Sequence, residues 1–240
     1  MNAFSDAFVY LNDPYNWTGP RGIFFLAGQH LKIAGLAMLI ALVVAVPPAV
    51  WLGHRGRGGG FLLGLSNVSR AVPTLAVLTI FAVTSIGFTI WAPVIALALF
   101  AVPPILANTY VGFREVDRDL VEAARAMGLN GRQMVLQAEL PQALPLIMTG
   151  IRTAAVQVAA TATLASLLGN PTLGTIIRSG FGRQDYGIVV AGALLVAALA
   201  MLTDLLLGTV SWAVTPGPKR LPFGRVRSRR AEAAAVPAAR

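Results

Sequence analysis

Three charged residues lie inside long apolar stretches of this 240-residue chain. Asp204 is acidic, and Arg70 and Arg152 are basic residues in two other stretches. A charge in an apolar medium is costly unless it is paired, so we expect Asp204 to form an ion pair with Arg152 or Arg70. Small residues share the face of Asp204, which should therefore point into the protein, and we expect the pairing to be mainly structural.

Polar residues also recur at intervals of four, as Thr153, Gln157 and Thr161. Residues four apart share one face of a helix, so these three form a polar stripe. The stripe could line a path for a polar solute, for which Pro73 and Thr74 are further candidates. It could equally form hydrogen bonds to a neighbouring helix, since small residues on the same segment would allow close packing.

The residue patterns of common catalytic sites are missing. There are no cysteines, and Lys32 and Lys219 follow Leu and Pro, so neither completes a G-x-x-x-x-G-K-[ST] phosphate loop. His30 and His54 form no H-E-x-x-H zinc site, and Asp204 has no second membrane aspartate for a protease. We expect no catalytic residue, no metal and no cofactor in this chain, and we interpret His30 and Lys32 as snorkelling residues at an interface.

The polar stretch 111–145 contains the most specific pattern in the chain. Asp119 can cap a helix, with Glu122 three residues later as in a capping box, and Gly128 suits the left-handed turn that ends it. Asn130 offers a second start signal, and Pro141 limits the second helix. The pattern predicts two short helices joined by a glycine turn.

The first of these helices carries an apolar stripe. Leu120, Ala123, Ala124 and Met127 lie at i, i+3, i+4 and i+7, so they share one face. Because two members are alanine, the backbone of a partner protein could approach this face closely. The stripe could instead pack on the ends of the chain's own helices, and amphipathicity alone leaves both interpretations open.

Composition indicates a membrane protein. The chain is 56% hydrophobic and only 12% charged, whereas soluble domains carry about 25% charged residues. A helix needs roughly 20 apolar residues to cross the core of a bilayer. Five segments of suitable length predict an all-α protein: Leu31–Leu52, Phe61–Val83, Trp91–Tyr110, Leu146–Leu168 and Ile188–Trp212.

Basic residues predict the orientation of these spans. With the N-terminus outside, most of the 19 Lys and Arg residues fall on the inner side, as the positive-inside rule requires. We expect residues 1–30 to be an extracytoplasmic segment with an interfacial lead-in, 31–213 a transmembrane domain, and 214–240 a basic, disordered cytosolic tail. The tail could bind nucleic acid, but contact with anionic lipid is the better interpretation.

The loop closely resembles a known motif. E-A-A at 122–124, Gly128 six residues after Glu122, and Leu140-Pro141 match the EAA loop of ATP-binding-cassette (ABC) importer permeases. Ala138 stands where that family usually has isoleucine. The resemblance implies that Glu122, Ala123, Ala124 and Gly128 dock on a separate ATP-binding subunit, which binds ATP and Mg²⁺, while Leu140 and Pro141 direct the chain into the fourth span.

Four further segments, at 70–76, 103–110, 150–155 and 160–165, resemble the osmoprotectant branch of these permeases. This resemblance implies a type I importer permease fold and import of glycine betaine, choline, carnitine or proline betaine. The implied partners are ATP-binding subunits, a second permease copy or paralogue, and an extracytoplasmic substrate-binding protein. An importer of the same build for another small solute, such as an amino acid, is the alternative, and a channel is a weaker one.

Overall fold

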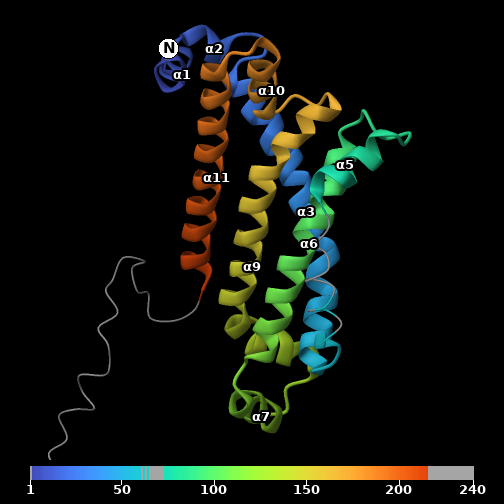
Figure 1. Ribbon diagram of the computed structural model, residues 1–240. Coiled ribbons are helices and arrows are strands. Elements are labelled where there is room, and N and C mark those ends of the chain that lie inside the picture. Colours follow the sequence, from blue (N-terminus) through green and yellow to red (C-terminus); the bar gives the residue numbers. More distant parts are fainter. Residues whose placement is uncertain (1, 61, 63, 65–72, 216–240) are drawn as a thin grey trace, which may run out of the picture.

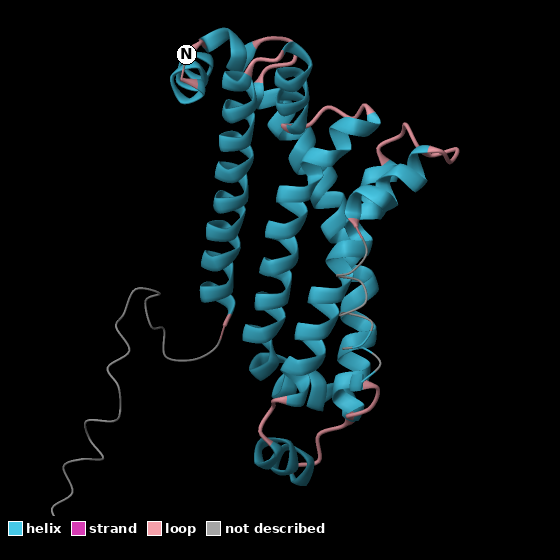
Figure 2. Cartoon of the chain, viewed as in Figure 1, coloured by secondary structure: helices cyan, strands magenta, loops and turns pink. Residues whose placement is uncertain are grey.

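A computed structural model describes residues 2–60, 62, 64 and 73–215 of the chain. This described part is helical, and it contains no β-strand (Figure 2). Its elements are α1 (Ala3–Asn12), α2 (Pro14–Thr18), α3 (Ile23–Arg55), α5 (Thr74–Ala82), α6 (Trp91–Arg114), α7 (Arg118–Ala126), α8 (Gly131–Gln133), a π-helix (Met134–Glu139), α9 (Leu140–Thr161), a 3-10 helix (Ala162–Leu168), α10 (Gly174–Arg183) and α11 (Tyr186–Val214).

Within the described residues, four helical stretches are long and apolar enough to cross a membrane. They contain four of the five predicted spans: Pro14–Arg55, Trp91–Arg114, Gly131–Leu168 and Tyr186–Val214. The first and third begin well before the predicted limits Leu31 and Leu146, and the other ends agree to within four residues. The fifth predicted span, Phe61–Val83, lies largely outside the described residues, and α5 is its described end.

The core is built from α3, α6 and α9, which pack side by side (Figure 1). Alanines at every fourth position of α3, from Ala37 to Ala49, are fully buried against these neighbours. Small side chains let helix backbones approach closely. Inside a membrane this close packing favours helix association, because the hydrophobic effect contributes little between helices that are surrounded by lipid. Helix α11 stands beside α9 and leaves much of its apolar surface exposed, as expected for contact with lipid.

One expectation about α3 is wrong. His30 is not an interfacial residue, because it is fully buried and its Nε2 lies 2.7 Å from the carbonyl oxygen of Ala159. The reason is visible in the helical register: His30 precedes Ala34, Ala37 and Ala41 on the face that packs into the bundle. Its neighbour Lys32 is exposed.

Helices α3 and α6 run in the same direction. The last turn of α3 lies beside the last turn of α6, since a Cβ added at Gly53 would be 2.6 Å from Cβ of Phe113. The first turn of α6 therefore lies toward the opposite end of the bundle from the last turn of α3. Helices α1, α2 and α10 gather at one end of the molecule and α7 lies at the other (Figure 1). The predicted basic tail beyond residue 215 and Arg70 lie outside the described residues.

Candidate functional site

The predicted loop folds into a short amphipathic helix, α7, at the end of the bundle. Its N-cap differs from the prediction, because Asp117 rather than Asp119 accepts a hydrogen bond, at 2.9 Å, from the backbone N–H of Asp119. The pattern of a carboxylate followed three residues later by Glu122 is therefore misleading. Asp117 precedes the first helical residue and reaches a free backbone N–H, which Asp119 cannot do from inside the first turn.

The end of α7 confirms the predicted glycine turn. Gly128 has φ of +81°, a left-handed conformation that side chains disfavour, and its N–H donates to the carbonyl of Arg125. The second start signal is also confirmed, since Asn130 and Gln133 form a reciprocal capping box with bonds of 2.9 and 3.0 Å. These two devices fix where α7 ends and where the chain turns back.

The second helix is not limited by Pro141, contrary to the prediction. The chain runs from α8 through the π-helix into α9 without a break. Pro141 is the second residue of α9 and follows the π-helix, where the backbone hydrogen-bond register changes and a residue without a backbone N–H is more easily accommodated. Leu140 is partly buried beside Phe113 and Ala143, so the loop joins the fourth span rigidly.

Most of the apolar stripe on α7 is left uncovered by the residues that the structure describes. Ala124 is buried against Met134 and Ala138, which attaches α7 to the π-helix. Leu120 and Met127 are 38% and 74% exposed, and Ala123 is exposed as well. The chain's own helix ends therefore cover one member of the stripe and leave a small apolar surface open beside the exposed Glu122.

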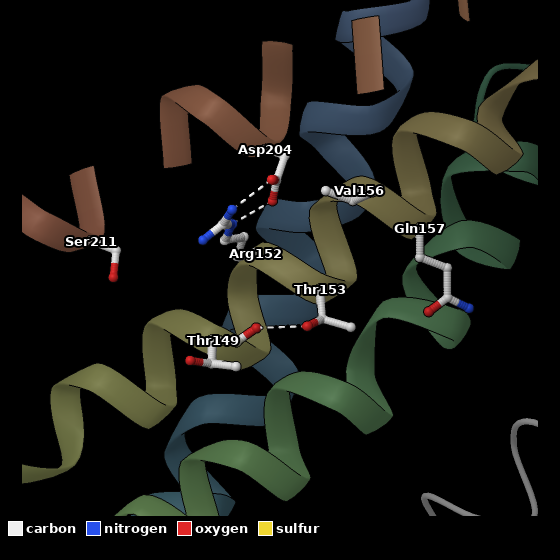
Figure 3. Close-up of a pocket in the computed structure, with 7 residues that line it drawn as sticks. All are labelled: Thr149, Arg152, Thr153, Val156, Gln157, Asp204 and Ser211. Carbon is white, nitrogen blue, oxygen red and sulfur yellow. Dashed lines mark hydrogen bonds and ion pairs between the residues drawn. The ribbon is translucent and has the colours of Figure 1, made fainter. Parts of the chain in front are cut away.

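A polar groove lies between α9 and α11. Arg152 donates from Nε and from one terminal nitrogen, one bond to each carboxylate oxygen of Asp204, so the two side chains form a bidentate ion pair (Figure 3). The groove has a volume of about 590 Å³. Its lining residues are Thr149, Arg152, Thr153, Val156, Gln157, Asp204 and Ser211.

This ion pair lies at the edge of the bundle rather than inside it. The side chains of Arg152 and Asp204 are 45% and 40% exposed. Asp204 is ten residues from the end of α11, which places it about 15 Å along the helix at 1.5 Å per residue. Charged groups at that depth do not face lipid, so the open side of the groove must meet water or another protein chain.

The polar stripe makes no side-chain hydrogen bond to a neighbouring helix within the described part of the chain. Thr153 and Thr161 donate to carbonyls of their own helix, at Thr149 and Gln157. Thr153 and Gln157 are exposed and line the groove, as Figure 3 shows.

The remaining path candidates lie elsewhere. Pro73 caps α5 in an extended conformation and is exposed, and Thr74 begins that helix. Helix α5 packs against α6 and the 3-10 helix. Neither residue lines the groove, nor does Thr161, so the structure brings together only Thr153 and Gln157 of the proposed path residues.

One contact was not anticipated from sequence. Nδ1 of His54, at the end of α3, lies 2.8 Å from Oε2 of Glu139, at the end of the π-helix. The two residues are 85 positions apart, and neither belongs to a motif that would single it out. The one signal in the sequence is the position of Glu139 beside Ala138 in a helix, since a neighbour of a buried residue can also face inward.

Comparison with known families gives one match over most of the chain. Residues 33–214 match the family described as "Binding-protein-dependent transport system inner membrane component".

Individual relatives are similar over most of their length. The chain is 37% identical to the carnitine transport permease protein OpuCB of Listeria monocytogenes, over 78% of this chain and 86% of that protein. It is 34% identical to the glycine betaine/carnitine/choline transport system permease protein OpuCB of Bacillus subtilis, over 81% and 89%. It is 33% identical to the osmoprotectant import permease protein OsmY of Salmonella typhimurium, over 81% and 83%.

The fold also matches a solved structure. A chain of the MetNI methionine ABC transporter, in an inward-facing conformation, superimposes with a TM-score of 0.66 at 19% identity. The match covers 81% of this chain and 96% of that one. At this identity the comparison shows a shared fold, that of a type I ABC importer permease.

Proposed function

Because this chain belongs to the family of binding-protein-dependent transport system inner membrane components, we propose that it is the permease subunit of an ATP-driven importer of osmoprotectants. It is a multi-pass inner-membrane protein with the fold of an importer permease. The proposed solutes are glycine betaine, choline, carnitine or proline betaine, in keeping with the names of its relatives.

The observation that carries the ATP-driven mechanism is the exposed stripe on α7. Leu120, Ala123 and Met127 leave an apolar surface at one end of the bundle, and the segment below them is continuous with α9. A protein partner that covers this stripe could push or pull on a membrane-spanning helix. We propose that the partner is a separate ATP-binding subunit, which binds ATP and Mg²⁺ and hydrolyses the nucleotide.

The groove between α9 and α11 is the proposed position of the translocation path. Thr153 and Gln157 offer hydroxyl and amide groups to a polar solute, and the exposed ion pair of Arg152 and Asp204 needs a neighbour that is not lipid. A second permease, either a copy or a paralogue, would close the open side of the groove. The two permeases would then enclose a path that opens alternately to the two sides.

Recognition of a quaternary ammonium solute is assigned to a separate extracytoplasmic binding protein. Cation–π contacts with a cage of aromatic side chains are the usual means of binding such a cation. The orientation that fits this delivery has the N-terminus outside and the C-terminus in the cytoplasm. Helix α7 then faces the nucleotide pool, and the end formed by α1, α2 and α10 faces the binding protein.

Uptake by cells tests the proposal directly. Cells with and without this subunit, grown at high salt, would be given labelled glycine betaine, choline, carnitine and one amino acid in turn. We expect uptake of at least one of the first three to depend on the subunit and on ATP. Dependence of amino acid uptake alone would favour the alternative solute class, and ATP-independent flux would favour a channel.

A further inference from the structure

The hydrogen bond between His54 and Glu139 joins two parts of the chain that have little else to hold them in register. Glu139 closes the π-helix Met134–Glu139, and π-helical segments are rare and concentrate at functional sites. His54 lies in the last turn of α3, the first membrane-spanning helix. Among the described residues, no other side-chain hydrogen bond connects α3 with the loop and π-helix, residues 115–139.

Neighbouring residues of the π-helix contact opposite partners. Ala138 and Met134 pack on the buried Ala124 of α7, so the π-helix moves with α7. Glu139, the next residue, extends its carboxylate to His54 on α3. A displacement of α7 therefore reaches α9 through the backbone, and it reaches α3 through this hydrogen bond as well as through apolar packing around Val50.

Burial makes the contact specific. Glu139 is only 5% exposed, and it borders a cavity of about 190 Å³ that Arg114, Arg118 and Arg125 also line. None of these arginines forms an ion pair with a carboxylate in the part of the chain that the structure describes, so His54 alone pairs with Glu139. Loss of the imidazole would leave a buried carboxylate without its partner, a costly state.

Apolar packing alone would not fix the position of α3 relative to the π-helix as closely as the hydrogen bond does. Its last turn touches α6 closely at Gly53, and Val50 packs beside Phe113. Such contacts hold helices together but tolerate small slides, whereas a hydrogen bond of 2.8 Å sets the relative position of two particular atoms.

We propose that His54 and Glu139 are positioning residues that transmit the movement of α7 to α3, so that the first span moves together with α9 during transport. This inference rests on the proposed function, since it assumes that a partner drives α7. The pair is separate from the exposed apolar stripe, because Leu120, Ala123 and Met127 do not line the cavity that His54 borders, although Glu122 does.

The test uses the whole transporter in proteoliposomes, with its ATP-binding subunit and its binding protein. His54→Ala and Glu139→Ala are each expected to preserve assembly and ATP hydrolysis without binding protein. Uptake per ATP hydrolysed should fall about fivefold in each, and no further in the double variant, because residues that share one interaction give non-additive effects. His54→Asn should recover at least half of the wild-type ratio, because its amide nitrogen can occupy the place of Nδ1.

Arg55→Ala is the matched control, since Arg55 is the next residue of α3 but stacks over the ring of Trp51 at 4.2 Å. It should leave the ratio unchanged. The absence of cysteines adds a second measurement: H54C/E139C should be uncoupled when reduced and recover when a short bifunctional reagent joins the two thiols.

The outcomes separate this inference from the proposed function. If the wild-type chain neither binds an ATP-binding subunit nor supports uptake, the proposed function fails. If wild type transports but the two alanine effects add, or both variants transport normally, the inference is wrong. Loss of assembly in His54→Ala would also overturn it, because the contact would then be merely structural.

Discussion

At the scale of single residues, the ion pair of Arg152 and Asp204 makes a sharp prediction. Asp204→Arg places two positive groups side by side in the groove, where they repel each other, so uptake should fall about tenfold or more. The reversed pair, R152D/D204R, restores opposite charges and should recover at least half of the uptake. Uptake of labelled substrate, normalised to the amount of protein in the membrane, measures both.

The outcome also tells whether the pair is structural. If the reversed pair restores the amount of protein and the uptake together, pairing is all that the site requires. If the amount of protein and the uptake of the reversed pair both stay at the level of Asp204→Arg, an ion pair between α9 and α11 is not sufficient for function.

Substitution of Gln157 tests whether this residue lines the translocation path or serves helix packing. Its side chain is exposed in the groove and forms no hydrogen bond to another helix in the described part of the chain, so Gln157→Ala should not disturb folding. We expect uptake to fall severalfold while co-purification with the ATP-binding subunit stays at the wild-type level. Gln29→Ala, on α3 and outside the groove, is the control and should transport normally. Unchanged uptake in Gln157→Ala would remove this residue from the path.

Some residue-level predictions are confirmed, both local ones and the long-range pairing of Asp204 with Arg152, whereas the local prediction that Asp119 caps α7 is wrong. Gly128 and the Asn130–Gln133 box could be predicted because a left-handed turn and a reciprocal cap depend on a few neighbouring residues. His30 was misjudged because its burial depends on which helix packs against it. The contact of His54 with Glu139 was not foreseen, since it joins residues 85 positions apart.

At the scale of elements, the stripe on α7 predicts a docking surface that can be removed without unfolding. Met127 is 74% exposed and Leu120 38% exposed, so aspartate at both positions leaves the bundle intact. L120D/M127D should abolish co-purification with an ATP-binding subunit, because two charges would be buried without partners in the interface. A pull-down from detergent-solubilised membranes measures this association.

A matched substitution separates docking from a general loss of apolar surface. Val83, after α5, is 84% exposed, and Val83→Asp adds one such charge away from α7. That variant should bind the ATP-binding subunit normally. Equal loss in both variants would mean that the stripe on α7 is not a specific surface.

The apolar pattern of the sequence predicts the long helices better than it predicts where the helices begin and end. Apolar length was sufficient to find α3, α6, α9 and α11, because a bilayer requires a long apolar helix and little else. It was not sufficient to see that the second loop helix continues into α9 through a π-helix. Pro141 suggested a break, but it follows the π-helix, where the backbone hydrogen-bond register already changes.

At the scale of the whole molecule, helix directions constrain the number of crossings. Helices α3 and α6 end side by side, and α9 returns beside them before α11 descends (Figure 1). Because α6 begins at the opposite end of the bundle from the last turn of α3, the described part of the chain is consistent with the five predicted spans. Figure 1 accordingly shows α1 at one end of the bundle and the last turn of α11 at the other.

Directions alone do not say which side is cytoplasmic, and the basic residues supply that prediction. Because the chain has no cysteine, single cysteines report position cleanly. We expect a membrane-impermeant maleimide to label Ser5→Cys and Gly182→Cys in intact spheroplasts, and to label Asp119→Cys only after the membrane is opened. Ser5 lies in α1, Gly182 in α10 and Asp119 in the exposed first turn of α7. The opposite pattern would place α7 outside the cell, away from ATP, and no nucleotide hydrolase could then act on the segment that joins it to α9.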